Sequence, residues 1–500
     1  MNEPPETEQH TNEAEILAQR RAKLQMLLDQ GVQPFGGRFE RSHANQFLVD
    51  HYEEGLQVKV AGRVTARRLH GKAAFCDLRD QSGTIQCYFK GNQIGAESFQ
   101  RFVDAIDMGD FLGVSGPLFK TRTEQVSVQV EQWEVLSKAL RPLPAKWHGL
   151  QDVETRYRRR YLDLVANPEV ARVFEQRSRI VDEIRAYLRA KNFLEVETPM
   201  MQSLAGGAAG EPFVTHHNAL DTDLYLRLAP ELFLKRLLVG GFDRVYEMNR
   251  NFRNEGLSPR HNPEFTMLEL YEAYSDCRGM MDITRELILH VAEKVFGSTT
   301  LTLGGKEVNL GKPWKELSFA QLMEEHYGIL PSDPLELVAE KLSKDNPDLS
   351  KEARAGGKKL SKGMMLTKIM TILQEQLEPS EQAEPIFMTD FLTVTSPLAK
   401  SRPDNPYVVE RFELFMGGME LANGYSELND PIDQKKRFEE QLASSDKKAA
   451  SVDEDFVTAL EHGMPPAGGL GIGIDRLVML LTGQPSIKDV ILFPQLRPLG

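Results

Sequence analysis

The stretch from Val245 to Tyr274 constrains the fold of this chain more than any other. Its first part, Val245 to Phe252, mixes β-branched and aromatic residues with polar ones and predicts a strand. Glycine, serine and proline then mark a loop over residues 253–263. A second strand is predicted from Glu264 to Tyr271. The chain must therefore build an antiparallel pair of strands joined by a long basic loop, which suits a bound polyanion.

The loop and the second strand carry the residues that such a ligand needs. Arg253 stands at the end of the first strand, and its guanidinium can hold two phosphate oxygens at once. Arg260 and His261 add donors, and Phe265 can stack on a flat base. The alternative is a solvated hairpin with scattered charges, but the fixed spacing of F-R-N-E and R-H-N-P-E-F favours a binding site.

A family resemblance rests on these residues. F-R-N-E-G-L-S-P-R-H-N-P-E-F resembles motif 2 of the class II aminoacyl-tRNA synthetases, and the T-M-L-E-L-Y-E-A-Y that follows resembles their lysyl branch. Residues 177–201 resemble motif 1, which builds the dimer interface in this class, and residues 468–483 resemble motif 3. The resemblance implies an α+β fold: a class II antiparallel sheet flanked by helices, with an N-terminal five-stranded OB β-barrel, in a homodimer.

Composition bounds the partners and the compartment. The net charge of −13 argues against a general nucleic-acid binder, so RNA binding needs local basic patches, and arginines cluster at residues 63–68 and 156–160. No apolar run approaches a membrane span, and the acidic, proline-containing start resembles neither a secretory signal nor a transit peptide. The three cysteines form no C-x-x-C pair. We expect a cytoplasmic protein without a membrane partner.

The sequence pattern suggests the domain boundaries, and the family resemblance implies what each domain does. We expect a disordered tail over residues 1–12, a helical segment over 13–55, an OB-fold anticodon-binding domain over 56–140, a proline-rich linker over 141–151 and a catalytic domain over 152–500. A helical insertion is expected at about 319–378 of the catalytic domain. Five short strands are expected in the OB domain, at residues 58–64, 73–78, 84–89, 111–116 and 126–135.

The resemblance also implies a site for ATP. The residues that match the nucleotide-binding positions of the family are Arg253, Glu255, His261, Asn262, Phe265, Glu413, Glu420 and Arg476. Arg253 and Arg476 take the catalytic positions on the phosphates, since activating an amino acid needs positioning and charge neutralisation. Glu413 and Glu420 are expected to hold Mg²⁺, with several ions accompanying ATP. The alternative is that each of these carboxylates pairs with an arginine, such as Arg411 or Arg476, and that no metal touches the protein.

Specificity is expected to rest on carboxylates. The positions implied for L-lysine are Gly207, Glu231, Glu269, Tyr271, Asn423, Tyr425 and Glu427. Glu231 is implied at the α-ammonium, and Glu269 and Glu427 at the ε-ammonium. The positions implied for the anticodon of tRNA(Lys) are Arg67, Phe75 and Gln86.

Three alternatives stay open. An aspartyl or asparaginyl synthetase needs a positive or amide-reading group where this chain has Glu427. A ligase that lysylates a protein lacks the OB domain. A catalytically inactive RNA-binding paralogue should have lost Arg253, Arg476, Glu413 or Glu420. The chain also departs from the lysyl pattern, with Gly210 and Glu211 in place of Ala-Arg and Met419 in place of Arg.

Overall fold

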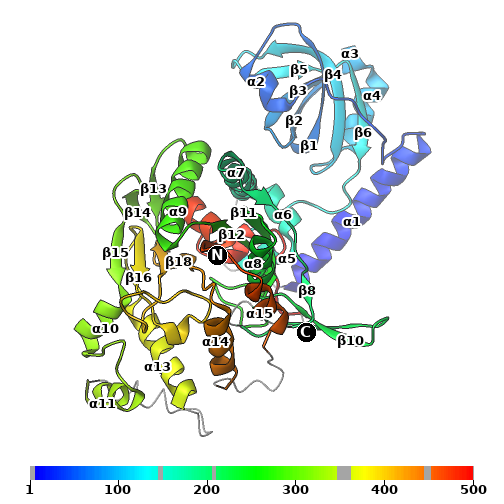
Figure 1. The fold of residues 1–500 in the computed structure, drawn as a ribbon. Coiled ribbons are helices and arrows are strands. Elements are labelled where there is room, and N and C mark those ends of the chain that lie inside the picture. Colours follow the sequence, from blue (N-terminus) through cyan, green and yellow to red (C-terminus); the bar gives the residue numbers. More distant parts are fainter. Residues whose placement is uncertain are drawn as a thin grey trace. The chain divides into compact units, whose positions relative to one another are not determined.

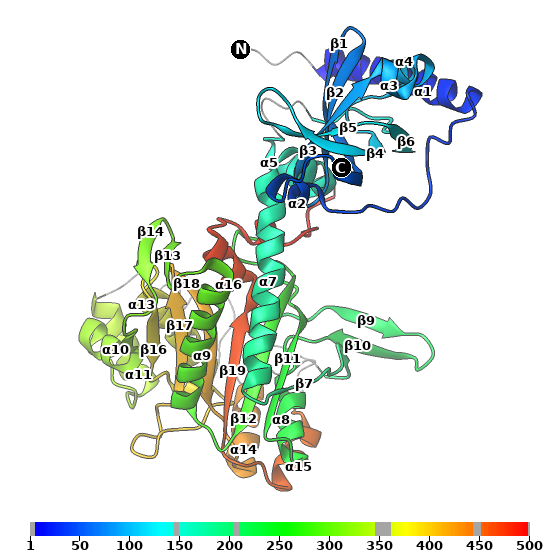
Figure 2. The same ribbon diagram turned by 90° about the horizontal axis from the view of Figure 1, so that it is seen from above.

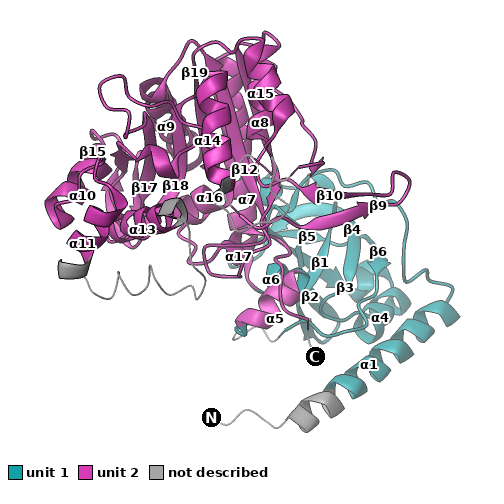
Figure 3. Cartoon of the chain, turned by 60° about the horizontal axis from the view of Figure 1, so that its bottom comes forward, with its two compact units in different colours: residues 1–152, 161–166 teal, residues 153–160, 167–500 magenta. Residues whose placement is uncertain are grey.

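The protein is described from a computed structural model that covers residues 6–144, 150–204, 206, 210–345, 362–443 and 452–498 (Figure 1; seen from above in Figure 2). The chain divides into two compact units (Figure 3). Unit 1 comprises residues 1–152 and 161–166, and unit 2 comprises residues 153–160 and 167–500. None of the helices in the described residues is long and apolar enough to cross a membrane.

Unit 1 is a closed β-barrel with associated helices. Its strands are β1 (Gln57–His70), β2 (Ala73–Arg79), β3 (Thr84–Lys90), β4 (Phe111–Lys120), β5 (Val126–Gln129) and β6 (Gln132–Ser137). Its helices are α1 (Glu6–Asp29), α2 (Asn45–Asp50), α3 (Gly91–Ile94), α4 (Ala96–Ala105) and, after Arg160, α6 (Arg160–Ala166). The order β1-β2-β3-β5-β4, with β4 pairing back onto β1, closes a ring of five strands, and β6 adds to β4. The expected five-stranded OB barrel is confirmed.

Two details of unit 1 differ from the sequence expectation. The strand expected over residues 126–135 is broken into β5 and β6, which pair with different parts of β4. Gly116 lets the chain pass closely there, because a Cβ at this residue would lie 1.9 Å from the carbonyl oxygen of Gln129. In addition, α1 begins at Glu6, inside the range expected to be a disordered tail.

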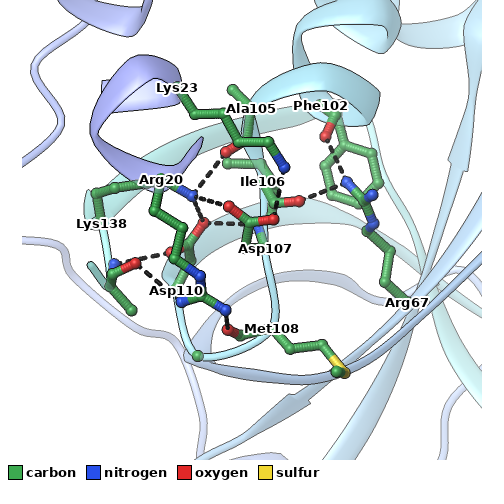
Figure 4. Close-up of polar contacts among 12 residues, drawn as sticks. Arg20, Lys23, Arg67, Phe102, Ala105, Ile106, Asp107, Met108, Asp110 and Lys138 are labelled. Atoms are coloured by element: carbon green, nitrogen blue, oxygen red, sulfur yellow. Dashed lines mark hydrogen bonds and ion pairs between the residues drawn. The ribbon is translucent and has the colours of Figure 1, made fainter. Parts of the chain in front are cut away.

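A buried ionic cluster ties α1 to the barrel (Figure 4). The Lys138 ammonium donates to Asp107 at 2.6 Å, to Asp110 at 2.7 Å and to the Ala105 carbonyl at 2.7 Å. Lys23 on α1 donates to the other oxygen of Asp107 at 2.6 Å. Arg20, one turn earlier on α1, donates to the carbonyl oxygens of Met108, Ala139 and Arg141. Charge-assisted hydrogen bonds thus add to the packing of Leu27 in the core in holding this helix.

Unit 2 is built on an eight-stranded sheet. In spatial order its strands are β15 (Lys315–Ser318), β16 (Ile386–Thr389), β17 (Arg411–Met416), β18 (Met419–Ser426), β19 (Ala467–Gly473), β12 (Glu264–Ala273), β11 (Arg244–Phe252) and β7 (Leu194–Glu195). Only the two outer pairs, β15–β16 and β7–β11, are parallel. Smaller sheets are formed by β8 (Met201–Gln202), β9 (Val214–His217) and β10 (Thr222–Leu226), and by β13 (Thr300–Leu303) and β14 (Lys306–Asn309).

Helices cover both faces of this sheet. On one face lie α7 (Pro168–Ala190), α9 (Cys277–Val291) and α16 (Ile474–Thr482), and Figure 2 shows α7 and α9 side by side. On the other face lie α8 (Glu231–Val239), α14 (Pro431–Ala443) and α15 (Glu454–Glu461). The short helices α5 (Val153–Arg158) and α17 (Ile487–Val490) also belong to unit 2. In the described residues, the region of the expected insertion contains α10 (Phe319–Tyr327), α11 (Leu335–Asp345) and α13 (Lys362–Leu377). The expected α+β class is confirmed.

The alternation along β12 decides where the site lies. Leu268 and Leu270 are fully buried in the core with residues of α7 and α9. The alternate residues of the strand point to the opposite face, as its two-residue period requires. Glu269 and Tyr271 are thereby presented to a cavity on that face.

Candidate active site

A cavity of about 1640 Å³ lies in unit 2 beside the hairpin of β11 and β12. Most of the residues expected to bind ATP and lysine line this cavity. Those lining it are Glu231, Arg253, Glu255, His261, Asn262, Phe265, Glu269, Tyr271, Glu420, Asn423, Tyr425, Glu427 and Arg476. Glu413 is buried behind this wall, and Gly207 lies outside the described residues.

Arg253 leaves β11 and faces Phe265 across the hairpin. Its backbone nitrogen donates to the Pro263 carbonyl at 2.9 Å, which fixes the start of the loop. Its guanidinium lies 5.1 Å from the centre of the Phe265 ring, a cation–π contact. Burial lowers the pKa of Arg253, although Glu255 and Glu420 work against this shift. Its Nε is buried without a hydrogen-bond partner in the described residues, so the cation can accept an anionic ligand.

The loop between the strands is tied to two other elements. Nε2 of His261 lies 3.0 Å from Nη2 of Arg476 on α16, and Nδ1 lies 2.8 Å from the Ser258 hydroxyl. Because the guanidinium can only donate, Nε2 accepts and the proton belongs on Nδ1. Burial and the Arg476 charge lower the pKa of His261 and keep the ring neutral. Arg260 donates to the Gly418 carbonyl at 3.1 Å, in the turn between β17 and β18.

The two candidate metal carboxylates stand on neighbouring strands and are both paired with arginines. Arg411 and Gln374 donate to Glu413, and Arg476 donates to Glu420 at 3.3 Å. Burial raises the pKa of Glu413 to about 8, since the repulsion from Glu420 adds to it and Arg411 only partly offsets it. No three His, Cys, Asp or Glu side chains converge as a metal site in the part of the chain that the structure describes. This is the arginine pairing that the sequence left open as the alternative, and a cation here would have to take its other ligands from phosphate oxygens.

At the other end of the cavity the side chains are acidic. Tyr271 donates to Glu269 at 3.2 Å, and Tyr425 donates to Glu231 at the start of α8. Burial and the repulsion from Glu231 raise the pKa of Glu269 to about 8. The pKa of Glu427, which follows β18, is also raised to about 8 by burial, against the pull of Lys235. This end of the cavity therefore has an affinity for cations.

Tight packing holds Glu427 in place. A Cβ at position 469 of β19 would lie 1.9 Å from Oε1 of Glu427 and 2.7 Å from the Tyr271 ring, so only glycine fits there. Oε1 itself is buried and has no hydrogen-bond partner among the described residues. A buried acceptor left open in this way is costly unless a ligand donates to it.

One residue of the site, Lys235, was not predicted from the sequence, and a second, Arg411, was named there only as a possible partner of the metal carboxylates. Lys235 lies four residues after Glu231 on α8 and pairs with Glu231 at 2.7 Å and with Glu427. Arg411 donates to Asn423 at 3.0 Å as well as to Glu413. The spacing of Glu231 and Lys235 on one helix was the only available signal for the first. For the second, the signal was that β17 places Arg411 and Glu413 on one face.

Comparison with known proteins decides the family. The family model described as tRNA synthetases class II (D, K and N) matches residues 152–497. The model of the OB-fold nucleic acid binding domain matches residues 58–136. The lysine–tRNA ligase of Carboxydothermus hydrogenoformans is 52% identical over 499 residues, which covers 98% of this chain and 99% of the relative. That of Pelotomaculum thermopropionicum is 50% identical over 97% of this chain and 95% of the relative.

This chain belongs to the lysine–tRNA ligase family of class II tRNA synthetases. The resemblance carried by motifs 1, 2 and 3 is thereby confirmed. The described structure also shows how the departures from the family pattern are accommodated. Met419 is buried in the core of unit 2, next to the Gly418 carbonyl that Arg260 binds. Gly210 lines the cavity, and the Glu211 carbonyl accepts from the Asn254 nitrogen at 2.7 Å.

In unit 1, the family's OB domain, the outer face of β2 and β3 carries a row of aromatic rings. Phe75 and Tyr88 are register partners with ring centres 4.9 Å apart. His70 and Phe119 extend the row at 6.1 and 5.9 Å. Such half-buried aromatics form a platform on which bases can stack. Tyr88 and Phe119 were not singled out from the sequence.

Of the three residues expected to read the anticodon, Gln86 lies on the sheet face of Phe75, whereas Arg67 points to α4. Gln86 is buried beside Phe75's strand, accepts from Ser127 at 2.9 Å and donates to Gln125 at 3.2 Å. The Arg67 guanidinium donates to carbonyl oxygens at the end of α4, including that of Val103 at 2.9 Å. The arginine opposite Phe75 in the sheet is Arg68, which pairs with Asp77 at 2.8 Å.

Proposed function

We propose that this protein activates L-lysine with ATP and transfers the lysyl group to the 3′ end of tRNA(Lys). The observation that carries the proposal is the acidic end of the cavity, where Glu231, Glu269 and Glu427 converge. A substrate with two ammonium groups suits these carboxylates, whereas an aspartate side chain would be repelled by them. The retained Arg253 and Arg476 argue against an inactive paralogue.

In the first step the lysine carboxylate attacks the α-phosphorus of ATP, pyrophosphate leaves, and a mixed anhydride forms. Arg253 is suited to the α-phosphate and to the substrate carboxylate, since its Nε is unpartnered in the described residues. Phe265 offers a face for adenine, with Asn262 and Glu255 beside it. Arg476, with neutral His261 against it, faces the outer phosphates. These groups neutralise charge that moves from substrate to pyrophosphate, and none forms a covalent bond.

Glu413 and Glu420 would hold Mg²⁺ that arrives with ATP, and the ion would supply further neutralisation of the phosphates. This part has a test of its own. Glu420→Gln should slow pyrophosphate exchange strongly and raise the Mg²⁺ concentration needed for half-maximal rate, because a carboxylate ligand is lost. Lysine binding without ATP should stay unchanged. A Gln variant with the Mg²⁺ midpoint and rate of the wild type would show that Glu420 is not a metal ligand and only pairs with its arginine.

In the second step a ribose hydroxyl at the 3′ end of the tRNA attacks the anhydride, and AMP leaves. The platform of Phe75 and Tyr88 is suited to stacking anticodon bases, with Gln86 nearby. We further propose a cytoplasmic homodimer, because α7 and β7 carry the motif that forms the dimer interface in this class. Light scattering on the purified protein tests the dimer.

The deciding experiment is ATP–pyrophosphate exchange measured with each of the twenty amino acids. Lysine should support exchange, and aspartate and asparagine should not. Exchange driven by aspartate or asparagine would overturn the assignment of the substrate. An absence of exchange with every amino acid would point to the inactive paralogue.

A further inference from the structure

Lys235 is a fully buried cation inside the acidic end of the cavity. It lies one turn along α8 from Glu231, and its ammonium nitrogen is 2.7 Å from a Glu231 oxygen. The same nitrogen pairs with Glu427, which comes from the end of β18. The rings of Tyr425 and Phe456 lie 5.5 and 6.0 Å from it. One ammonium thus joins the two carboxylates expected at opposite ends of a bound lysine.

The charges at this end of the cavity do not balance. Glu231, Glu269 and Glu427 supply three carboxylates, and Lys235 supplies one ammonium. The arginines that approach from neighbouring elements have other partners: Arg227 pairs with Glu247 at 2.7 Å, and Arg411 pairs with Glu413. Arg253 lies against Phe265 and its charge also acts on Glu269, but in the proposed mechanism it binds the α-phosphate and the substrate carboxylate. The remaining deficit of two positive charges equals the number of ammonium groups on lysine.

We propose that Lys235 is a positioning residue of the amino-acid pocket: its ammonium clamps Glu231 to Glu427 and sets the pocket's charge deficit to that of an amino acid with a second ammonium group. The proposal rests on the proposed function, since it explains how the same pocket selects its substrate. Tyr271 and Tyr425 donate to the carboxylates but carry no charge, so they leave this count unchanged.

Removing the cation has a specific consequence. Burial alone would lower the pKa of Lys235, but Glu231 and Glu427 outweigh it and raise that pKa, so the ammonium stays charged. Without it, the carboxylates repel each other and Glu427 takes up a proton more readily. The ε-ammonium of lysine must then displace that proton. Lysine binding becomes weaker at neutral pH and recovers as the pH rises.

The test compares Lys235→Met, which has similar length and no charge, with Lys341→Met, which removes a lysine paired with Asp333 in the insertion. For Lys235→Met, the KM for lysine in pyrophosphate exchange should rise at least about tenfold at pH 7 relative to wild type, and this ratio should fall to about threefold at pH 9. The KM for ATP should stay within about threefold for both variants. Lys341→Met should match the wild type in both constants.

Lys235→Gln is shorter, keeps an N–H donor, and serves as a second variant. A variant with native circular dichroism and an unchanged lysine KM contradicts the proposal, as does a lysine defect of equal size at pH 7 and pH 9. If neither variant folds, Lys235 is a structural cation and the proposal is also overturned. If instead the wild type shows no exchange with lysine, the proposed function fails first, so the two failures are distinguishable.

Discussion

The OB unit and the catalytic unit each bury a lysine among carboxylates. In the OB unit, Lys138 and Lys23 face Asp107 and Asp110, so ammonium and carboxylate groups are equal in number. Asp110 also accepts from two backbone nitrogens, those of Asp107 and Ala139. Burial alone would raise the pKa of Asp107, but Lys138 and Lys23 outweigh it and the pKa is lowered.

In the catalytic unit the same residue types are out of balance. Glu231 and Glu427 pair with Lys235, Glu269 lines the same cavity, and Oε1 of Glu427 has no hydrogen-bond partner among the described residues. The pKa values of Glu269 and Glu427 are both raised to about 8, chiefly by burial.

The difference separates a structural cluster from a binding site. A buried ion pair contributes to folding only when its partners satisfy one another, as they do around Lys138. A cluster with surplus carboxylates destabilises the empty protein, and a cation of matching charge relieves it. Binding of a cationic ligand therefore supplies electrostatic stabilisation that the empty catalytic unit lacks.

The largest effect is expected from Lys138→Met. Losing this ammonium leaves the buried Asp110 without a cation and Asp107 with Lys23 alone, which should lower the free energy of unfolding of the OB unit by about 3–5 kcal/mol. Denaturant unfolding monitored in the OB unit measures it. Lys120→Met, in an exposed pair with Glu124, should cost about 0–1 kcal/mol. Equal effects of the two variants on the free energy of unfolding would show that the cluster has no structural role.

Glu427→Gln should act on the ligand instead. It keeps the shape and removes a charge, so the KM for lysine should rise roughly 100-fold, about 3 kcal/mol, while the KM for ATP stays nearly constant. Pyrophosphate exchange gives both constants, and Glu439→Gln on the exposed face of α14 is the control. A parallel rise in both KM values would show that Glu427 does not face the amino acid.

Phe75→Ala should weaken tRNA binding and leave the activity of the catalytic unit unchanged. Loss of one base stack should weaken tRNA(Lys) binding by about 1–3 kcal/mol, measured as a rise in the KM for tRNA(Lys), with pyrophosphate exchange unchanged. Tyr88→Ala should have a similar effect because the two rings form one platform. Phe47→Ala on α2, an exposed aromatic outside that row, serves as the control. Normal charging by both platform variants would move the anticodon site elsewhere.

The last contrast is a difference in the sign of the pH dependence of stability. The pKa values of Glu269 and Glu427 are higher in the folded catalytic unit than the usual 4.5, so folding binds protons and stability falls as pH rises from about 4.5 through 8, by at most about 1.4 kcal/mol per pH unit for each proton. For Asp107 the folded pKa is below its usual 3.8, so its contribution is present above that value and is lost as pH falls.

Unfolding of the two units measured from pH 4 to 9, without and with saturating lysine, tests this contrast. Lysine should remove the alkaline loss of stability in the catalytic unit and leave the OB unit unchanged. Stability curves of the same sign in both units would contradict the difference in charge balance.

Much of the catalytic site could be predicted because motif 2 is a local hairpin. The alternation of Phe265, Glu269 and Tyr271 on β12 fixes their common face from sequence alone. Lys235 could not be assigned, because its second partner, Glu427, arrives from a strand far along the chain. Pairing of that kind depends on the order of strands in the sheet, which spacing does not reveal.

In the OB unit, a β-bulge limits what can be predicted from the sequence. The register of β1 against β2 shifts between Val64 and Ala66, which inserts one residue into the alternation. The shift places Arg68 opposite Phe75 and turns Arg67 toward α4. A one-residue change of this kind exchanges which arginine shares the aromatic face, and a single sequence carries no clear signal of it.

The central claim is that the empty amino-acid pocket lacks two positive charges and holds protons in their place. Calorimetric titration of the wild-type protein with L-lysine at pH 7, in buffers of different ionisation enthalpy, counts the protons exchanged on binding. Because Glu269 and Glu427 have pKa values of about 8 in the empty pocket, binding should release roughly one proton or more per site. Binding of lysine with no proton release, or with proton uptake, would contradict the account.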